Sequence, residues 1–413
     1  MMDNESVKIG IVGCEGYAYQ LIIRIQTIPL SGEITAVVAL DPSSDGANYC
    51  RAHGIRVFPT VDEMLASGGF DVVMNLTPIH FHAEISKQCL AAGFPVWMEK
   101  PPVATVQDLD SLNTASLAAG LPITVCFNTL FAFRAQQLKA ELLAEKYGKI
   151  GRVKLKAAWS RTSAYFTRCD WAGKLNKEGR WVLDGDINNP LSHFICAGLF
   201  FAGRDQASLA NPVSVQAELY RANQIESEDT SAIRIHTEEG VEILSWLTLA
   251  SEGGGDALVV IETEKAVINF INLDRIEIAY HDGSTESRGS YKESRIEMIE
   301  HLCRSLRGHE VPISSLAAIR PFTVAVNAAF ESAGIIQSIP EEALDVVALD
   351  KGETHVIIKG ISDIFERAFE ASALFSEIGV PWACRSEVFD AKDYSNFPVR
   401  FQAQVKREEA LKA

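Results

Sequence analysis

The stretch VWMEKPP at residues 96–102 decides how the rest of this 413-residue chain is interpreted. Three apolar residues predict a buried strand, and two prolines stop the Glu-Lys pair that follows it. Proline lacks an N–H and restricts the residue before it to extended conformations, so Glu99 and Lys100 should lie at the carboxyl end of that strand. Ligands of open α/β sheets bind at this edge, which makes Lys100 a candidate for chemistry. Taken alone, the motif is equally compatible with a salt bridge and a rigid turn.

The sequence around this stretch alternates between predicted strands and helices. Apolar runs predict strands at residues 7–12, 34–40, 55–58, 71–76, 96–98 and 123–127, and helices at 17–27, 45–53, 82–92 and 108–119. Continuous apolar strands are typical of a parallel sheet that is covered on both faces. We therefore expect an α/β Rossmann-type, doubly wound parallel sheet over residues 1–128.

The turn after the first strand carries a partial dinucleotide-binding fingerprint. The pattern G-x-G-x-x-G/A falls on Gly13, Glu15 and Ala18, so a glutamate stands where glycine usually lets a pyrophosphate approach the backbone. A carboxylate about 4 Å from a phosphate charge would cost on the order of 4 kcal/mol. Either Glu15 points to solvent and Gly16 gives the clearance, or dinucleotide binding is weak. Glu15 could also simply complement the dipole of the next helix.

An acidic residue follows the second predicted strand. Asp41 could accept hydrogen bonds from the adenosine ribose of a dinucleotide, which favours NAD over NADP. The nearest arginine that could receive a 2′-phosphate is Arg51.

Several motifs together resemble the glucose-fructose oxidoreductase / inositol dehydrogenase / MocA (Gfo/Idh/MocA) family. They are GIVG at 10–13, TP at 77–78 with His82 four residues on, EKP at 99–101 and GKIG at 148–151. The resemblance is good from residue 7 to about 160 and thinner to about 335. The residues expected to bind NAD are Gly13, Glu15, Gly16 and Tyr17 of the first turn, Asp41 after the second strand, and Thr77, Pro78, His82, Glu99 and Lys100. His82 would line the nicotinamide side or cap its helix.

After Gly151 the predicted strands alternate apolar and polar residues, as half-buried strands do. They span residues 154–159, 213–220, 232–237, 241–249, 258–262, 267–271 and 276–280. The prediction is an α+β domain with a large open antiparallel sheet, covering residues 129–413 and ending in an extension from about 340. The family resemblance implies that such a sheet often makes oligomer contacts, so we expect a homodimer or homotetramer.

The segment DGDINNPLSH at residues 184–193 runs into an apolar stretch. Related dehydrogenases place D-x-x-x-H at the start of this helix, where Asp orients the His that takes the substrate hydroxyl proton. By that register His193 is the histidine, but Asn189 replaces the aspartate. Asparagine can orient an imidazole but cannot stabilise an imidazolium. Asp186 or Asp184 could take over that role. Without the resemblance, a histidine at a helix start is more often structural, and the resemblance favours the catalytic interpretation of His193.

Basic and aromatic residues flank this segment, which suits a polyhydroxylated or acidic ligand, although packing explains the tryptophans equally well. They are Arg161, Trp171, Arg180 and Trp181. No metal is expected, because His80 and His82 lack the partners that a zinc site needs.

The last hundred residues predict helices at 313–336 and 356–375, followed by an aromatic tail at 382–401. The tail is too apolar for a disordered linker and should pack on the second domain.

Composition excludes some classes of protein. A net charge of −16 without any basic block argues against nucleic-acid binding. The first residues are polar, and no apolar window approaches the roughly 20 residues that span a membrane. Eight scattered cysteines without a CxxC pair fit a reducing compartment. We expect a cytoplasmic protein.

The leading hypothesis is an NAD(P)-dependent dehydrogenase that acts on a secondary alcohol of a sugar or cyclitol. Lys100 would hydrogen-bond the reacting oxygen, Glu99 would position Lys100, and His193 would be the general base. Two alternatives stay open. One is a glycosidase or epimerase that recycles a tightly held NAD; the other is a non-catalytic nucleotide or sugar sensor, which Glu15 and Asn189 keep possible.

Overall fold

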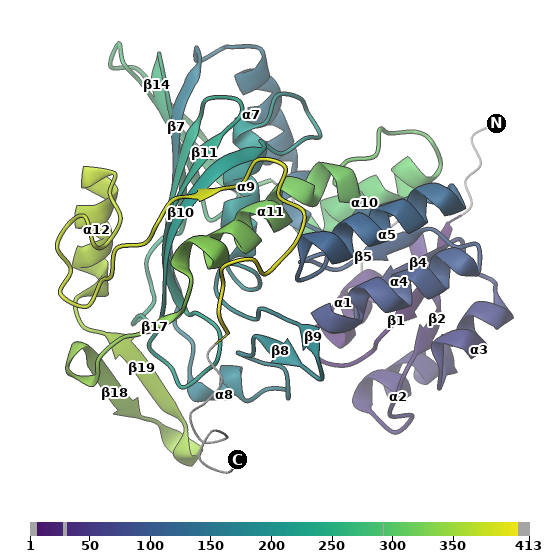
Figure 1. The fold of residues 1–413 in the computed structure, drawn as a ribbon. Helices are drawn as coiled ribbons and strands as arrows, with labels where there is room; N and C mark the ends of the chain where they lie inside the picture. Colours follow the sequence, from purple (N-terminus) through teal and green to yellow (C-terminus); the bar gives the residue numbers. More distant parts are fainter. Residues whose placement is uncertain (1–5, 28–30, 292, 404–413) are drawn as a thin grey trace. The chain divides into compact units, whose positions relative to one another are not determined.

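The computed structural model describes residues 6–27, 31–291 and 293–403, and the chain divides into two compact units (Figure 1). The first unit contains the described residues up to 103, with 107–136 and 291–320. The second contains residues 104–106, 137–290 and those from 321 onward. The chain therefore returns to its first unit at residues 291–320. The predicted division at residue 128 does not include this return.

Within the described residues, the first unit is built on a six-stranded parallel sheet in the order β3-β2-β1-β4-β5-β6. The strands are β1 (Val7–Val12), β2 (Gly32–Val38), β3 (Arg56–Phe58), β4 (Val72–Asn75), β5 (Val96–Met98) and β6 (Ile123–Val125). Parallel pairing of mainly apolar strands, of which β4, β5 and β6 are buried throughout, confirms the predicted doubly wound sheet.

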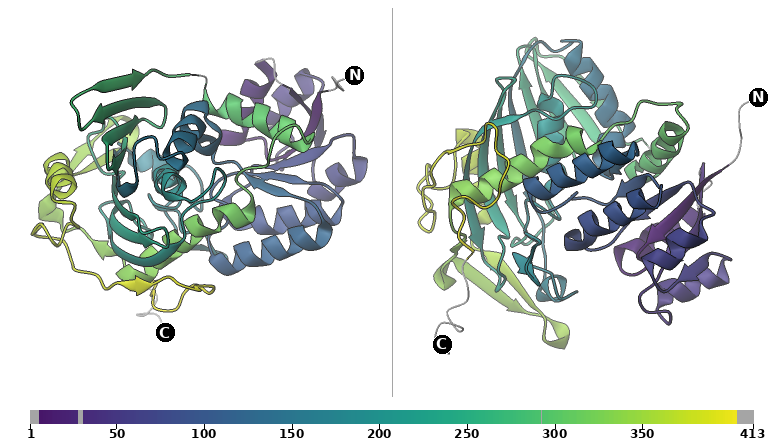
Figure 2. Two further views of the ribbon diagram at one scale, coloured as in Figure 1. Left: turned by 90° about the horizontal axis from the view of Figure 1, so that it is seen from above. Right: turned by 45° about the vertical axis from the view of Figure 1, so that its right-hand side comes forward.

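Helices lie on both sides of this sheet (Figure 2). They are α1 (Tyr17–Thr27), α2 (Asp45–Ala52), α3 (Val61–Ser67), η1 (Ile79–Phe81), α4 (His82–Ala91), α5 (Val106–Ala119), α6 (Asn128–Phe131) and α10 (Ser294–Leu306). Helix α10 was not predicted from the sequence. Its buried residues Met298, Ile299 and Leu302 recur at helical spacing, so the signal was present.

In the part of the second unit that the structure describes, a ten-stranded mixed sheet runs in the order β16-β15-β14-β13-β7-β12-β11-β10-β17, with β20 (Phe389–Asp390) beside β10. The long strands are β7 (Ile150–Ala158), β10 (Pro212–Arg221), β11 (Thr230–Thr237), β12 (Glu242–Thr248), β13 (Leu258–Thr263), β14 (Ala266–Ile271), β15 (Arg275–Tyr280) and β16 (Thr285–Arg288). Strand β17 is Gln337–Ser338. Most neighbours are antiparallel, while β7 pairs with β12 in parallel. The predicted α+β second part is confirmed.

Helices cover one face of this large sheet. They include α7 (Phe133–Leu143), α9 (Ser192–Ala202) and α11 (Leu316–Ala333). A Cβ added to Gly198 of α9 would lie 3.0 Å from the Leu155 side chain and 3.3 Å from that of Ile243. Glycine at this position therefore lets α9 approach β7 and β12 closely.

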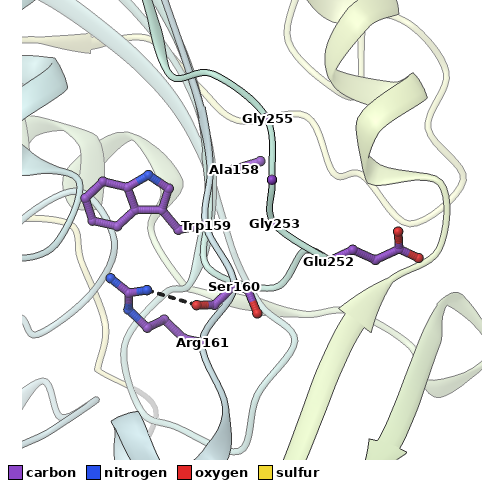
Figure 3. A pocket seen from close by; sticks show the side chains of 8 residues that line it. Ala158, Trp159, Ser160, Arg161, Glu252, Gly253 and Gly255 are labelled. Carbon is purple, nitrogen blue, oxygen red and sulfur yellow. Dashed lines mark hydrogen bonds between the residues drawn. The ribbon is translucent and has the colours of Figure 1, made fainter. Parts of the chain in front are cut away.

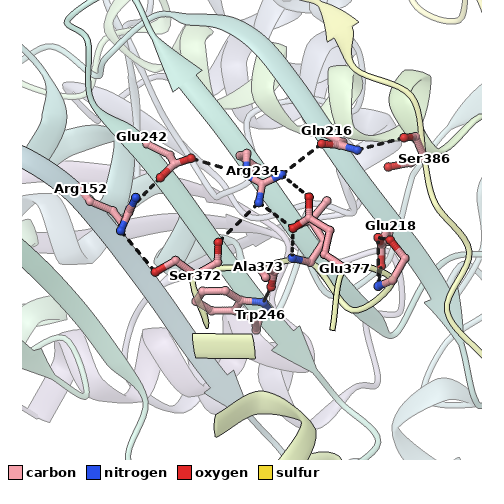
Figure 4. A network of polar contacts seen from close by, with 12 residues as sticks. Arg152, Gln216, Glu218, Arg234, Glu242, Trp246, Ser372, Ala373, Glu377 and Ser386 are labelled. Atoms are coloured by element: carbon pink, nitrogen blue, oxygen red, sulfur yellow. Dashed lines mark hydrogen bonds and ion pairs between the residues drawn. The ribbon is translucent and has the colours of Figure 1, made fainter. Parts of the chain in front are cut away.

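The C-terminal extension covers the opposite face over β7, β10, β11 and β12. Trp246 packs there against helix α12 (Ile361–Ala371) and donates from its indole nitrogen to the Ala373 carbonyl at 2.9 Å. Arg234 of β11 pairs with Glu377 at 2.7 Å, and Arg152 of β7 pairs with Glu242 at 2.6 Å (Figure 4). This part of the sheet is therefore not an open surface in the chain.

The prediction of one helix over residues 356–375 is wrong at its start. Strands β18 (Leu344–Ala348) and β19 (Thr354–Ile358) form an antiparallel hairpin, and α12 begins only after Gly360. The β-branched residues of Thr354–Ile358 favour a strand. Gly360 adopts a left-handed conformation (φ +67°), which separates this strand from helix α12.

The aromatic tail packs on the second unit, as predicted. Phe397 and Phe401 contact the ring of Phe330 in α11, with centroids 6.1 Å and 5.0 Å away. Trp181 joins them, 5.2 Å from Phe397, which explains this flanking tryptophan by packing. Among the described residues, no helix combines the length and the apolar character needed to cross a membrane.

Candidate active site

Two glycines set the path of the turn between β1 and α1. Gly13 and Gly16 have φ angles of +105° and +55°, which residues with side chains rarely adopt. A Cβ on Gly13 would lie 3.3 Å from the Leu76 carbonyl oxygen, so two segments approach closely at the sheet edge. No heavy atom lies within 4 Å of a Cβ built on Gly16. The turn thus presents accessible backbone at the edge where β1 and β4 end.

Glu15 is exposed at this turn, and its carbonyl accepts a hydrogen bond from Ala18 N at 3.0 Å. Of the two arrangements considered for Glu15, the solvent-facing side chain is the one that the structure has. Gly16 is also exposed and supplies the open backbone. The carboxylate is therefore not held within the turn.

Asp41 lies three residues beyond the end of β2, which stops at Val38 rather than at Leu40. Its Oδ1 accepts hydrogen bonds from Ser43 N at 2.8 Å and Ser43 Oγ at 2.6 Å. These bonds lower the pKa of Asp41, so the exposed side chain is ionised at neutral pH. Arg51 turns its guanidinium to the Pro42 carbonyl at 2.7 Å.

His82 is buried beneath the sheet edge, with 1% of its surface exposed. Its Nε2 lies 2.7 Å from the Thr77 carbonyl, and its Nδ1 lies 3.0 Å and 3.1 Å from the carbonyls of Pro101 and Pro102. Burial lowers the pKa of the imidazole, while the three carbonyls raise it. The ring contacts carbonyls and not the free N–H groups of α4, so it does not cap that helix. It joins the loop after β4, which contains Pro78, to the loop after β5.

Glu99 and Lys100 follow β5 at the same edge. Glu99 N donates to the Asn75 carbonyl at 2.9 Å, which continues the pairing of β5 with β4. Burial raises the pKa of the Glu99 carboxyl to about 7, against the opposing effects of Lys100 and Arg295. Glu99 Oε2 is buried and has no hydrogen-bond partner among the described residues. Lys100 is half-buried beside it.

Arg295, from the unpredicted helix α10, belongs to the same cluster. Its guanidinium carbon lies 5.9 Å from the ring centroid of Tyr17, the first residue of α1, and its Nη1 lies 3.3 Å from Glu293 Oε1. The ring of Tyr17 stays accessible, since 43% of the residue is exposed. No sequence motif marks Arg295, because it is nearly 200 residues away from Glu99 in the chain.

The histidine segment belongs to the second unit. His193 is the second residue of α9 and is half-buried. Asn189, four residues earlier, donates from Nδ2 to Asp184 Oδ1 at 2.5 Å. Asp184 also accepts from Gly173 N at 2.7 Å and pairs with Arg168 at 3.3 Å. Asp184 therefore fixes the orientation of the Asn189 amide.

Lys139 stabilises the other end of the same helix. It is fully buried, and its ammonium donates to the carbonyls of Phe200, at 2.6 Å, and of Gly203. Burial lowers its pKa to about 7. A cation that satisfies free carbonyls complements the negative end of α9 and anchors the element that carries His193.

Asp186 is fully buried next to a second carboxyl that the sequence did not suggest, Glu228. Ser231 Oγ donates to Asp186 Oδ2 at 2.8 Å, while Asp186 Oδ1 and Glu228 Oε1 lack partners among the described residues. Burial raises the pKa of both carboxyls, and the Glu228 charge raises that of Asp186 further. The contacts found for Asp186 face β11, so Asp184 rather than Asp186 is the acid joined to Asn189.

Replacing Glu228 with glutamine should relieve a pH-dependent loss of stability. Because the folded-state pKa is raised, folding favours the protonated acid, and stability falls as pH rises through that pKa. Chemical denaturation at pH 5 and pH 8 measures the free energy of unfolding. Relative to the wild type, this free energy should be higher for the variant at pH 8 than at pH 5. Neighbouring Asp229 is a comparison for the free energy of unfolding and not for its pH dependence, because burial raises its pKa too. It accepts from Ala222 N and from both nitrogens of Asn223. Asp229→Asn should cost about 2–3 kcal/mol, and equal pH profiles for Glu228→Gln and the wild type would contradict the expectation.

Residues 7–127 match the sequence model of the GFO_IDH_MocA family, described as an oxidoreductase family with an NAD-binding Rossmann fold. Residues 7–127 belong to the Gfo/Idh/MocA oxidoreductase family. The family prediction is thereby confirmed. Inositol 2-dehydrogenase of Corynebacterium glutamicum (strain R) is 28% identical over 98 residues, which are 24% of this chain and 29% of that protein. The scyllo-inositol 2-dehydrogenase (NADP(+)) IolU of Bacillus subtilis is 23% identical over 260 residues, 62% of this chain and 74% of its own.

Solved Gfo/Idh/MocA-like structures share the fold over most of the chain. An oxidoreductase from Agrobacterium radiobacter in complex with NAD+, L-tartaric acid and magnesium has a TM-score of 0.67 at 19% identity, covering 79% of this chain and 96% of its own. The WlbA dehydrogenase from Bordetella pertussis in complex with NADH and UDP-GlcNAcA has a TM-score of 0.66 at 21% identity, covering 80% and 97%. At such identities the likeness shows the fold.

The first unit of the chain brings most of the predicted cofactor residues to one sheet edge. The strand register places Val12, Asn75 and Met98 side by side, so the segments that follow them adjoin. The turn at Gly13, the Thr77 loop and Lys100 all start there. His193, Asn189 and Asp186 belong to the second unit and are described within it. The roles of these residues toward a cofactor and a substrate stay predictions.

Proposed function

We propose that the chain is an NAD-dependent dehydrogenase that transfers a hydride between nicotinamide and the secondary alcohol carbon of a sugar or cyclitol. The observation that carries this proposal is the position of Lys100. It follows β5 at the carboxyl edge of a parallel sheet, in the same compact unit as the glycine turn after β1. Ligands of doubly wound sheets bind at this edge.

The residues at the edge fit a dinucleotide. Gly13 and Gly16 leave two positions of the turn without a side chain, and an added Cβ on Gly13 would already approach the Leu76 carbonyl at 3.3 Å. Glu99 is half-buried at this edge, and its Oε2 has no hydrogen-bond partner among the described residues, so a polar ligand group could supply one. Ionised Asp41 would accept hydrogen bonds from ribose hydroxyls and repel a 2′-phosphate, which favours NAD over NADP.

The reaction follows from the chemistry of two side chains. Bound NAD would supply the hydride acceptor. The Lys100 ammonium would donate to the reacting oxygen and stabilise its alkoxide character, while Glu99 holds the lysine by charge. His193 would take the hydroxyl proton as general base. Asn189, held by Asp184, would orient the imidazole.

The named relatives support a polyol substrate. Two of them are called inositol 2-dehydrogenase and scyllo-inositol 2-dehydrogenase. The C. glutamicum match spans only 29% of that relative, so its substrate transfers as a proposal. At 23–28% identity the substrate itself has to be found by experiment.

A homo-oligomer also stays a prediction, and the structure narrows its interface. The extension already covers the sheet face over β10, β11, β12 and β7. On the same face the strands farther along carry the apolar residues Leu258, Val260, Val267 and Ile271 together with Asn269, Arg275 and Glu277. Subunit interfaces usually combine an apolar centre with a polar rim. Self-association through the sheet would therefore use this part of the face.

Calorimetry with NAD and NADP tests the proposal, combined with a screen of polyols for NADH formation. We expect NAD to bind in the micromolar range and more tightly than NADP. Gly13→Val should abolish binding, since the branched side chain would meet the Leu76 carbonyl. Absence of binding at millimolar dinucleotide would favour the non-catalytic sensor. Tightly held NAD without net NADH formation would favour the glycosidase or epimerase that recycles NAD.

A further inference from the structure

Arg161 lies on the sheet face that α9 covers. Side chains alternate along β7, and Leu155 faces Gly198 of α9, so Trp159 and Arg161 point to that face as well. The extended pairing continues past the end of β7, because Arg161 N donates to the Leu249 carbonyl at 3.0 Å. The Trp159 ring contacts Phe194 edge-on, with centroids 6.2 Å apart. Phe194 directly follows His193, so this arginine stands near the start of α9.

A cavity of about 420 Å³ opens beside Arg161 (Figure 3). One wall is formed by residues 158–161 and the other by residues 252–255. Gly253 and Gly254 have φ angles of +81° and +93°, and no atom lies within 4 Å of a Cβ built on Gly254. Figure 3 shows Trp159 and Arg161 pointing to one side and Glu252 to the other. The cavity has the volume of a small-ligand site. Trp159 and Arg161 project from its edge, away from the glycine segment (Figure 3).

The Arg161 guanidinium is held between two aromatic rings and has no carboxylate partner among the described residues. Its carbon lies 5.0 Å from the ring centroid of Trp159 and 5.0 Å from that of Tyr165, and its Nη1 donates to the Ser160 carbonyl at 2.9 Å. In the part of the chain that the structure describes, no carboxylate lies within ion-pair distance of Arg161. A guanidinium has five N–H groups in a planar fork, so several remain for a ligand.

Arg168 shows the contrast within the same aromatic stack. Its guanidinium carbon lies 3.9 Å from the Tyr165 ring and 5.1 Å from the Trp171 ring, so it resembles Arg161 in its stacking. Its Nη2, however, pairs with Asp184 at 3.3 Å. Among the described residues, Arg168 therefore has a carboxylate partner, and none lies within ion-pair distance of Arg161.

We propose that Arg161 binds the anionic group of an acidic sugar substrate, a carboxylate or a phosphate, an inference that rests on the dehydrogenase function proposed above. A chain with a net charge of −16 repels anions at long range, so recognition of one requires a local cation. A stacked guanidinium binds such oxygens in a bidentate manner. A neutral polyol needs no cation held in this way.

Matched substrates test the proposal. Glucuronate, glucose 6-phosphate, glucose and myo-inositol would be compared with NAD for the wild type and for Arg161→Gln. The acid that is the better substrate of the wild type should lose roughly 10–100-fold in kcat/KM in the variant, mainly through KM, as expected for a charge-assisted hydrogen bond. Neutral substrates and the Kd of NAD should change less than about threefold. The carboxylate and phosphate arms decide which anion is recognised.

Arg275→Gln is the control, because it removes the same charge from an exposed arginine that pairs with Asp256 at 3.4 Å. Arg275→Gln should leave kcat/KM unchanged for every substrate. Melting temperatures equal to that of the wild type would show that both variants fold. A wild type that prefers neutral polyols, or an Arg161→Gln variant that affects acidic and neutral substrates equally, would overturn the proposal and leave the dehydrogenase intact.

Direct binding separates this proposal from the proposed function. Saturation-transfer NMR can detect glucuronate and glucose 6-phosphate on the full chain without NAD. Binding by the wild type that is lost in Arg161→Gln would support an anion site even if no dehydrogenase activity were found. If the wild type bound neither glucuronate nor glucose 6-phosphate in these NMR experiments, the proposal would be refuted.

Discussion

Replacing Lys100 with methionine should lower kcat/KM at least about a thousandfold on whichever alcohol the chain oxidises, which corresponds to about 4 kcal/mol of transition-state stabilisation. Methionine keeps the length and the apolar stem of the side chain but cannot donate to the reacting oxygen. The loss should appear in kcat more than in the affinity for NAD, because alkoxide character develops only during the reaction. Steady-state kinetics and calorimetry on the same preparation measure both quantities.

The matched control for this variant is Lys87→Met. Lys87 is exposed on α4 and donates to Ser111 Oγ at 2.9 Å, so removing it should leave turnover within about twofold. Full turnover in Lys100→Met would show that the proposed role of Lys100 is wrong. Glu99→Gln is a useful companion. It removes a carboxyl whose pKa burial raises to about 7, so any pH dependence of turnover that arises from Glu99 near that value should flatten.

Replacing Glu331 with alanine should destabilise the second unit by about 3–5 kcal/mol. Glu331 lies in α11 with 1% of its surface exposed. Its two oxygens accept from Tyr394 Oη at 2.6 Å, Val399 N at 2.6 Å, Arg400 N at 2.5 Å and Phe401 N at 2.8 Å. Without the side chain, all four donors lose their acceptor. Urea denaturation should show the loss of stability, and limited proteolysis should show earlier cleavage near residue 400.

Two further variants decide whether the carboxylate itself is responsible. Glu331→Gln preserves the shape but turns an amide N–H toward a donor, so most of the destabilisation should persist. Glu387→Ala changes a glutamate whose side chain is 89% exposed and 3.7 Å from Arg400, and it should cost less than about 0.5 kcal/mol. If Glu331→Ala stayed within 1 kcal/mol of the wild type, the tail would be held by its aromatic contacts alone.

The first sheet could be predicted because its signals are local. Each strand is an apolar run of three to seven residues, and turn residues separate it from an amphipathic helix. Where local signals conflict, prediction failed. Residues 354–358 precede a strongly amphipathic helix. The predicted helix was therefore extended over them, although their own composition favours a strand. The exposed position of Glu15 also depends on a turn conformation that only the structure defines.

The sequence by itself determined that the chain begins with a doubly wound parallel sheet of the Gfo/Idh/MocA family and that Lys100 lies at its carboxyl edge. Strand periodicity and proline geometry act over a few residues, and these are enough for both conclusions. Only the tertiary structure decided which other side chains contact the predicted site residues. It brought Arg295 of α10 to Tyr17, Glu228 to Asp186 and Asp184 to Asn189. It also laid the C-terminal extension over the second sheet. Such contacts arise from the burial of whole elements against each other, and no local pattern of residues encodes their partners.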